Sequence, residues 1–380
     1  MPSDLRDIIR SAAIGPAKKL DVDFLYRRGR RRATIATALS IAGIVLVVAG
    51  AVAVATNLSP SRPRVDPAGQ NNDATPGPSP ADVVAPCGGF DVCTHVDTPI
   101  EQFVVGDDAV WAAGFMVFRI DPATDEVEAI RDLGAWAVEL LGDESHVWAV
   151  VESDGHPNPW VQVVALDPES LEVSARSTDL PGTNTGDVHA AIGSGAVWVT
   201  GPGDAVHRVD AETLEVESFP YSDEIDRNPD HGPPHVAVVG ETLWLGQDDG
   251  TLAAVDTRDG SIIGTPTELG RGISAMAARG DDLFGVLYDG EGTLVRFTRG
   301  RQVGTAPLPE GGPLEVAVRA DDVFVLLETP SGTKVIGFNA VNLDVLDPVD
   351  GLDGTGGMGA GPAGVWVSDW EKGTVFRERP

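Results

Sequence analysis

Residues 189–198 read HAAIGSGAVW, and six further ten-residue segments align with them without a gap. Each has an apolar stretch, then a tight turn of Gly, Asp or Ala, then an aliphatic residue followed by an aromatic one. The other six segments cover residues 102–111, 139–148, 235–244, 275–284, 315–324 and 357–366. A repeat near 40 residues with strand-type content is typical of β-propeller blades. The sequence therefore predicts an all-β fold, a seven-bladed β-propeller.

Each repeat also indicates how its strands follow one another. The ten-residue segment is predicted to hold the innermost strand, its turn and the start of the second strand. In four repeats the third strand ends in an apolar residue followed by an aspartate, at Asp121, Asp167, Asp210 and Asp256. An Asp at a hairpin corner usually accepts backbone N–H bonds. We therefore expect these carboxylates to shape turns rather than to form a carboxylate ring.

The seventh repeat, residues 358–380, supplies three strands and then stops. The unassigned segment Phe90–Thr98 has the length and the alternating character of a strand, and it precedes the first inner strand. We expect it to be the fourth strand of the seventh blade. The two ends of the domain would then close the ring without a covalent bond.

The N-terminal part of the chain predicts a membrane anchor. Residues 33–56 contain no charged side chain, and at about 1.5 Å per residue they exceed the roughly 30 Å hydrocarbon core of a bilayer. Five arginines lie within residues 27–32, directly before this span, so the positive-inside rule places the N-terminus in the cytoplasm. The competing interpretation is a cleaved signal peptide. Such peptides have a short basic lead before an apolar core of about 7–15 residues.

The resulting domain organisation has four parts. Residues 1–32 form a cytoplasmic basic tail, 33–56 a transmembrane helix, 57–86 a disordered spacer rich in Pro, Gly and Ser, and 87–380 the extracytoplasmic propeller. Four lysines against 23 arginines, with abundant Ala and Gly, are typical of a GC-rich bacterial genome. The expected location is therefore a bacterial plasma membrane, crossed by a single span.

The net charge of −31 excludes one class of partner. Residues 1–32 carry a net charge of +5, so the rest of the chain carries −36. Such a field repels phosphate backbones, attracts divalent or organic cations and keeps an exported domain soluble. We therefore expect no nucleic acid as a partner.

The chain has two cysteines, Cys87 and Cys93, between the spacer and the first blade. Outside the membrane such a pair is expected to be oxidised to a disulfide that closes a small loop. A zinc site would need two further ligands, and only His95 lies nearby.

The first position of the aligned segments is a candidate binding site, because it falls at the start of the innermost strands. In order, it is occupied by Gln102, Glu139, His189, His235, Ala275, Glu315 and Gly357. Glu139, His189 and His235 belong to adjacent repeats and are candidate ligands of a divalent metal ion. His156, Trp160 and His231 lie in neighbouring loops and extend the candidate ligand-binding set. The competing interpretation is structural: such a His bonds a loop carbonyl, and such a Glu is solvated.

The inner strands, the aromatic residues near Gly-Asp turns and the apolar-Asp hairpins resemble the YVTN/NHL-type bacterial propellers. That group includes virginiamycin B lyase-like proteins and pyrroloquinoline-quinone-repeat-like folds. The resemblance covers about residues 90–380 and implies the architecture. The lyases act through a His/Glu constellation and a divalent ion, but only Pro234-His235 matches, so no catalytic residue is carried over. The tail is similar to bacterial membrane proteins associated with alternative sigma factors, without the His/Cys zinc pattern of many anti-sigma domains.

No enzyme motif adds to these candidates. Residues 354–359 match the dinucleotide fingerprint GxGxxG, but an inner blade strand is expected after them where that motif needs a helix. The chain has no GxSxG, P-loop, HExxH or CxxC motif. The leading interpretation is a non-enzymatic, membrane-anchored module that binds a small ligand or an envelope protein. The alternatives are a metal-dependent lyase or hydrolase acting through Glu139, His189 and His235, and a sigma-factor-associated membrane sensor.

Overall fold

The computed structural model describes residues 92–96, 98–142, 146–153, 159–183, 188–201, 203–221, 232–330, 332–346, 348–352, 356–370 and 373–378. They all belong to one compact unit, Pro86–Pro380. The predicted tail, transmembrane span and spacer, residues 1–86, lie outside the described residues. Among the residues that are described, there is no helix with the length and apolar character needed to cross a bilayer.

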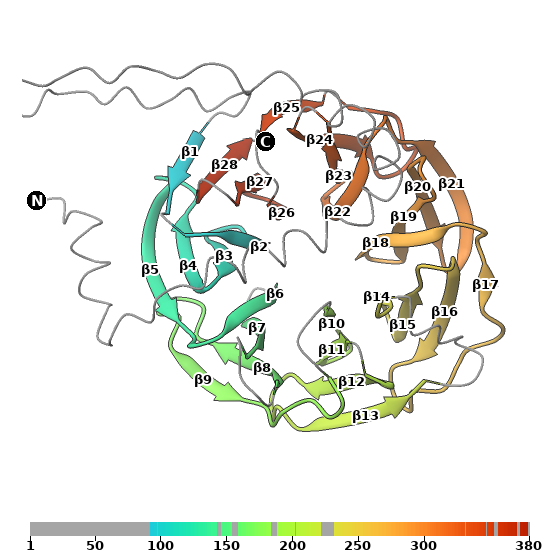
Figure 1. Cartoon of the computed structure of the whole chain (residues 1–380), viewed down its shortest axis with the longest axis horizontal. Helices are drawn as coiled ribbons and strands as arrows, with labels where there is room; N and C mark the ends of the chain where they lie inside the picture. Colours follow the sequence, from blue (N-terminus) through green and yellow to red (C-terminus); the bar gives the residue numbers. More distant parts are fainter. Residues whose placement is uncertain are drawn as a thin grey trace, which may run out of the picture. The chain divides into compact units, whose positions relative to one another are not determined.

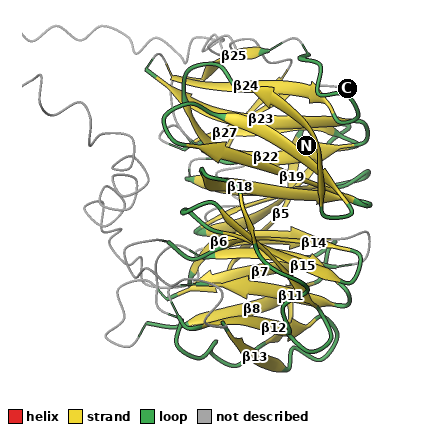
Figure 2. Cartoon of the chain, turned by 90° about the vertical axis from the view of Figure 1, so that its right-hand side faces the viewer, coloured by secondary structure: helices red, strands yellow, loops and turns green. Residues whose placement is uncertain are grey.

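The described residues form seven four-stranded antiparallel sheets arranged as blades around a central axis (Figure 1). In the view of Figure 2 these residues are drawn as strands and loops only. Blade 1 contains β2 (Ile100–Val105), β3 (Val110–Gly114), β4 (Met116–Asp121) and β5 (Glu126–Asp132). Blade 2 contains β6 (Trp136–Gly142), β7 (Val147–Glu152), β8 (Val161–Leu166) and β9 (Val173–Arg176). Blade 3 contains β10 (His189–Gly193), β11 (Ala196–Thr200), β12 (Ala205–Asp210) and β13 (Val216–Pro220).

The remaining blades follow the same order from the inside outwards. Blade 4 contains β14 (His235–Val239), β15 (Thr242–Gly246), β16 (Thr251–Asp256) and β17 (Thr267–Glu268). Blade 5 contains β18 (Gly272–Arg279), β19 (Asp282–Tyr288), β20 (Thr293–Thr298) and β21 (Arg301–Pro307). Blade 6 contains β22 (Gly312–Arg319), β23 (Asp322–Thr329), β24 (Gly332–Asn339) and β25 (Val349–Leu352). Blade 7 contains β26 (Met358–Gly361), β27 (Gly364–Asp369), β28 (Thr374–Glu378) and β1 (Val92–His95).

The aligned segments form the part of each blade that the sequence predicts. In blade 3 the segment comprises β10, the turn at Ser194-Gly195 and the start of β11, with His189 opposite Thr200. Ser194 and Gly195 have φ values of 52° and 72°, as a two-residue hairpin turn requires. The aromatic residue near the end of the segment is buried: Trp148, Trp198 and Trp366 are at most 1% exposed. These rings pack the blades against each other, as expected for a propeller core.

The predicted ring closure is also confirmed. β1 pairs with β28 over Val92↔Arg377 to His95↔Thr374, so the first described strand completes the last blade. Cys93 in β1 is disulfide-bonded, whereas Cys87, its predicted partner, lies outside the described residues. The two ends of the domain are therefore held in one sheet.

The turn between the third and fourth strands follows one pattern in five blades. The side chains of Asp121, Asp167, Asp210 and Asp256 accept backbone N–H bonds two or three residues on, as predicted, and Asn339 does so in blade 6. The backbone bonds are the largest cause of the lowered pKa values of Asp121, Asp167 and Asp210, whereas at Asp256 the side chain of Arg258 lowers the pKa most. The residue four positions on donates its N–H to the carbonyl of the first turn residue and has a positive φ. This fifth position is occupied by Asp125, Leu171, Leu214, Gly260 and Leu343.

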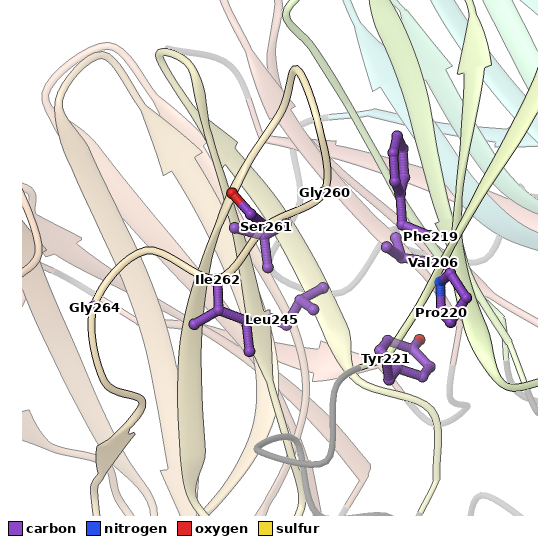
Figure 3. A pocket seen from close by; sticks show the side chains of 10 residues that line it. Val206, Phe219, Pro220, Tyr221, Leu245, Gly260, Ser261, Ile262 and Gly264 are labelled. Carbon is purple, nitrogen blue, oxygen red and sulfur yellow. The ribbon is translucent and has the colours of Figure 1, made fainter.

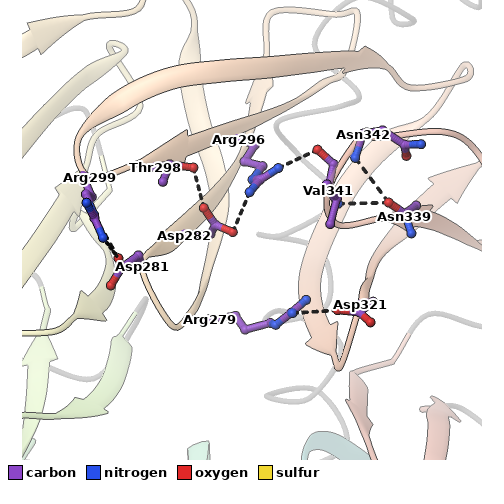
Figure 4. A network of polar contacts seen from close by, with 10 residues as sticks. All are labelled: Arg279, Asp281, Asp282, Arg296, Thr298, Arg299, Asp321, Asn339, Val341 and Asn342. Carbon is purple, nitrogen blue, oxygen red and sulfur yellow. Dashed lines mark hydrogen bonds and ion pairs between the residues drawn. The ribbon is translucent and has the colours of Figure 1, made fainter.

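These turns connect neighbouring blades. Arg131 of blade 1 donates to the carbonyl of Leu171 in blade 2, at 3.0 Å. Arg296 of blade 5 donates to the carbonyl of Val341 in blade 6. Figure 4 shows this second contact, together with a further link from Arg279 of blade 5 to Asp321 of blade 6, at 2.8 Å. The fifth turn position therefore lies where one blade meets the outer strands of the blade before it.

Candidate functional site

The innermost strands form a ring in which each contacts the next: β2, β6, β10, β14, β18, β22 and β26, which returns to β2. Figure 1 shows this arrangement around the central axis. Glu139 lies near the start of β6, directly after a register shift between Ala137 and Glu139. His189 and His235 are the first residues of β10 and β14. The three residues therefore lie at the same end of three consecutive inner strands.

The structure brings these three side chains together, and we call them the inner-strand cluster. Oε1 of Glu139 is 3.8 Å from Nδ1 of His189, and the two side chains are 18% and 24% exposed. The rings of His189 and His235 are tilted against each other, with centroids 3.9 Å apart and planes at 34°. A carboxylate and two imidazoles from three blades thus form one partly exposed polar surface.

A buried hydroxyl links the two histidine-bearing strands. Thr200, opposite His189 in the sheet, is fully buried, and its Oγ1 donates at 2.6 Å to the carbonyl of Pro234, the residue before His235. Because this bond joins blade 3 to blade 4 beside both rings, it fixes where the two strands begin relative to each other. Thr200 is therefore a positioning residue for the cluster.

Thr200 was not among the sequence-based candidates, although the sequence contains a signal for it. The residue two positions after the repeat aromatic is Thr200 or Ser368 in two blades. In the other five it is apolar or Gly: Ala113, Val150, Gly246, Val286 and Leu326. Ser368 makes the corresponding bond, from its Oγ to the carbonyl of Ile100 at 2.7 Å. A hydroxyl at this position thus marks a hydrogen bond to the next blade.

The other predicted binding residues have different surroundings. Gln102 is 8% exposed and buried in β2. Oε2 of Glu315 accepts the backbone N–H of Met358 at 2.7 Å, which ties blade 6 to blade 7. Trp160 packs partly buried against the core of blades 1 and 2, and its backbone N–H donates to Oγ of Ser153 at 2.9 Å. His156 and His231 lie outside the described residues.

A divalent metal site needs at least three donors around one point. Within the described ranges, no three His, Cys, Asp or Glu side chains form a group that could hold a metal ion. The inner-strand cluster instead offers a carboxylate acceptor, imidazole nitrogens and two closely packed, tilted rings. That combination fits a ligand or peptide with both polar and planar groups.

Comparisons with known proteins bear on the fold. No protein-family model and no curated protein sequence matches this chain. The β-propeller domain of Cps50 (Swd1) from Myceliophteria thermophila is similar in structure, with a TM-score of 0.62 at 12% sequence identity, over 76% of this chain and 98% of that one. BamB from Moraxella catarrhalis matches with a TM-score of 0.48 at 15% identity, over 73% of this chain and 84% of that one. At 12% identity the likeness to the Cps50 (Swd1) domain shows the β-propeller fold alone.

Proposed function

We propose that this protein is a binding or sensing module, anchored by one helix in a bacterial plasma membrane, with its propeller on the extracytoplasmic side. The observation that carries the proposal is the inner-strand cluster, in which three blades bring their polar side chains together. The Glu139 carboxylate lies 3.8 Å from a ring nitrogen of His189, and the centroids of the two imidazole rings are 3.9 Å apart. Rigid strands hold this surface, as a preorganised binding site requires. The uncharged span at residues 33–56 and the arginines before it support the anchor and its orientation.

The occupant of this surface is a small polar ligand or a segment of an envelope protein. A metal-dependent lyase or hydrolase is not favoured, because Glu139, His189 and His235 do not form a three-donor metal group. The sigma-factor-associated alternative depends on residues 1–32, which lie outside the described residues. Binding through the cluster is therefore the function that we put to the test.

Orientation is tested by protease treatment of intact spheroplasts, with antibodies against the propeller and the tail. We expect the propeller to be degraded from outside while residues 1–32 stay protected. A propeller that is degraded only after lysis would contradict the orientation.

Binding is tested in living cells by placing a photo-crosslinking amino acid at Asp248 or Asp107. Asp248 is exposed just after β15, whose last residue Gly246 lies opposite His235. Asp107 is exposed in the β2–β3 turn, at the other end of the inner strands, and is the matched control. We expect an adduct from Asp248 that is lost when Glu139→Gln and His189→Gln are combined, and none from Asp107. Equal labelling from both positions, or labelling indifferent to the double variant, would contradict the proposal.

A further inference from the structure

A second candidate binding site lies away from the inner-strand cluster, between the outer parts of blades 3 and 4. It is a cleft of about 360 Å³. From blade 3 come Phe219, in the outer strand β13, and Tyr221, the residue that follows β13. From blade 4 come Leu245 and Ile262 (Figure 3). A volume of this size falls in the range of small-molecule sites, roughly 300–1,000 Å³.

The cleft lies beside one departure from the repeat. The fifth position of the third-to-fourth turn is a buried leucine in blades 2, 3 and 6, where Leu171, Leu214 and Leu343 are at most 6% exposed. In blade 4 that position is Gly260, which has φ +71 and lines the cleft. A Cβ at Gly260 would lie 2.2 Å from Cδ1 of Phe219. At the interface between blades 3 and 4, the ring of Phe219 therefore occupies the space beside Gly260 where a side chain would begin, and this ring also lines the cleft.

The outer strand of blade 4 is also reduced. β17 has only two residues, and before it the chain makes a single bridge, between Val255 and Ile262. Gly264, with φ +75, follows and lines the cleft as well. The side chain of Ile262 lies across the cleft from Phe219 and Tyr221 (Figure 3).

An exposed carboxylate, Asp259, directly precedes Gly260 and Ser261, two residues that line the cleft. Ser261, which lines the cleft, donates its backbone N–H to Oδ1 of Asp259 at 2.9 Å. The hydrogen bonds from Ser261 are the largest cause of the lowered pKa of Asp259. Arg258 is paired with Asp256 at 2.7 Å, and its charge also lowers the pKa of Asp259. The strong net negative charge of the chain adds to the same field.

We propose that this cleft binds a small organic cation with an apolar body of one or two rings. The apolar walls would contact the apolar body, and the faces of the two aromatic side chains would attract the cationic group. Asp259 would face the charge at the rim. The cleft volume of about 360 Å³ is more than twice the roughly 150 Å³ of a cavity that holds one benzene molecule, so the cleft has room for a body of one or two rings. This site goes beyond the proposed function and does not depend on the inner-strand cluster.

The test compares three probes that share one ring and differ in charge: benzyltrimethylammonium, benzyl alcohol and benzoate. Binding to the full-length protein is measured by ligand-observed NMR and by calorimetry. We expect saturable binding of the cation, at least about tenfold tighter than that of benzoate, with benzyl alcohol between them. Equal affinity for the three probes, or no saturable binding of the cation, would overturn the proposal.

Two variants locate the binding. Asp259→Asn keeps an acceptor for Ser261 and removes the charge, so we expect a threefold or greater loss of cation affinity and no change for benzyl alcohol. Asp107→Asn removes the same charge from an exposed turn of blade 1 and should leave both affinities unchanged. Tyr221→Ala should weaken all three probes, with thermal unfolding as the check on folding. Equal losses in Asp259→Asn and Asp107→Asn would show general charge attraction and overturn the assigned site.

Discussion

Arg377 joins the last blade to the first, and its replacement by methionine tests how the ring is held closed. Its Nη1 lies 2.9 Å from Oδ1 of Asp125 and also donates to the carbonyl of Pro122. Its Nε donates to the carbonyl of Ala363 at 2.9 Å. The guanidinium lies 5.2 Å from the centre of the Trp366 ring. One side chain therefore connects β28 with the third-to-fourth turn of blade 1.

The expected cost follows from burial. The side chains of Arg377 and Asp125 are only 8% and 11% exposed, and removal of one partner from such a pair costs about 3–5 kcal/mol because the other charge stays buried. Methionine keeps most of the apolar bulk over Trp366. We therefore expect Arg377→Met to lower the free energy of unfolding by about 3 kcal/mol or more. The measurement is urea unfolding followed by tryptophan fluorescence.

A matched control and a rescue make this prediction sharp. Arg299→Met breaks a pair with Asp281 whose side chains are 82% and 62% exposed, so it should cost less than about 1 kcal/mol. Asp125 occupies the fifth turn position, which is leucine in three other blades. The double variant Arg377→Met/Asp125→Leu copies that apolar interface and should recover most of the loss. A loss in Arg377→Met no larger than in Arg299→Met, or no recovery in the double variant, would refute this account of closure.

Three further predictions concern single buried groups. Burial lowers the pKa of the fully buried His207 below its ordinary 6.5. Because the unfolded chain then binds the proton more readily, the free energy of unfolding should fall as pH drops below about 6.5, by up to about 1.4 kcal/mol per pH unit. His207→Phe should flatten this slope in urea titrations at pH 7.5 and 5.5. Gly260→Ala should lower the melting temperature more than Gly240→Ala, since both have positive φ but only Gly260 has a ring atom 2.2 Å from the added Cβ; equal shifts would show that the ring moves freely. Thr200→Val should cost about 1–3 kcal/mol in urea unfolding, because a carbonyl of the next blade loses its buried donor; a neutral effect would remove Thr200 as a positioning residue.

The repeat alone predicted most of the architecture. Blade number and the order of the inner strands follow from a pattern that recurs seven times. The Asp turns follow from an apolar-Asp pair in four repeats, and the closure follows from the three strands of the seventh repeat. Such a pattern constrains every blade in the same way, so errors in one repeat are corrected by the others. The apolar-Asp pattern did not predict the corresponding turn of blade 6. An asparagine, Asn339, accepts the backbone N–H bonds there, because its amide oxygen can replace a carboxylate oxygen as the acceptor.

The candidate site could be predicted only in part, for a physical reason. Spacing along the chain places Glu139, His189 and His235 at equivalent positions of three strands, and the structure brings them together. The same spacing applies equally to Gln102 and Glu315, yet one is buried and the other is bonded to a backbone N–H of the next blade. Equivalent positions share a backbone environment, but the contact across to the next blade depends on the side chain that the neighbour presents.

Departures from the repeat are therefore more informative about function than the repeat itself. At the fifth turn position a buried leucine packs one blade against the blade before it, and another residue at this position changes the contacts of that interface. Asp125 turns the closing interface into a buried ion pair with Arg377, whereas Gly260 makes room for the ring of Phe219 at the edge of the cleft. Both changes give up apolar burial that a leucine would provide, worth about 1.5–3 kcal/mol for a fully buried side chain. A propeller can forgo that stability at two interfaces while the other turns retain it, and those two interfaces are where substitutions will separate stability from binding.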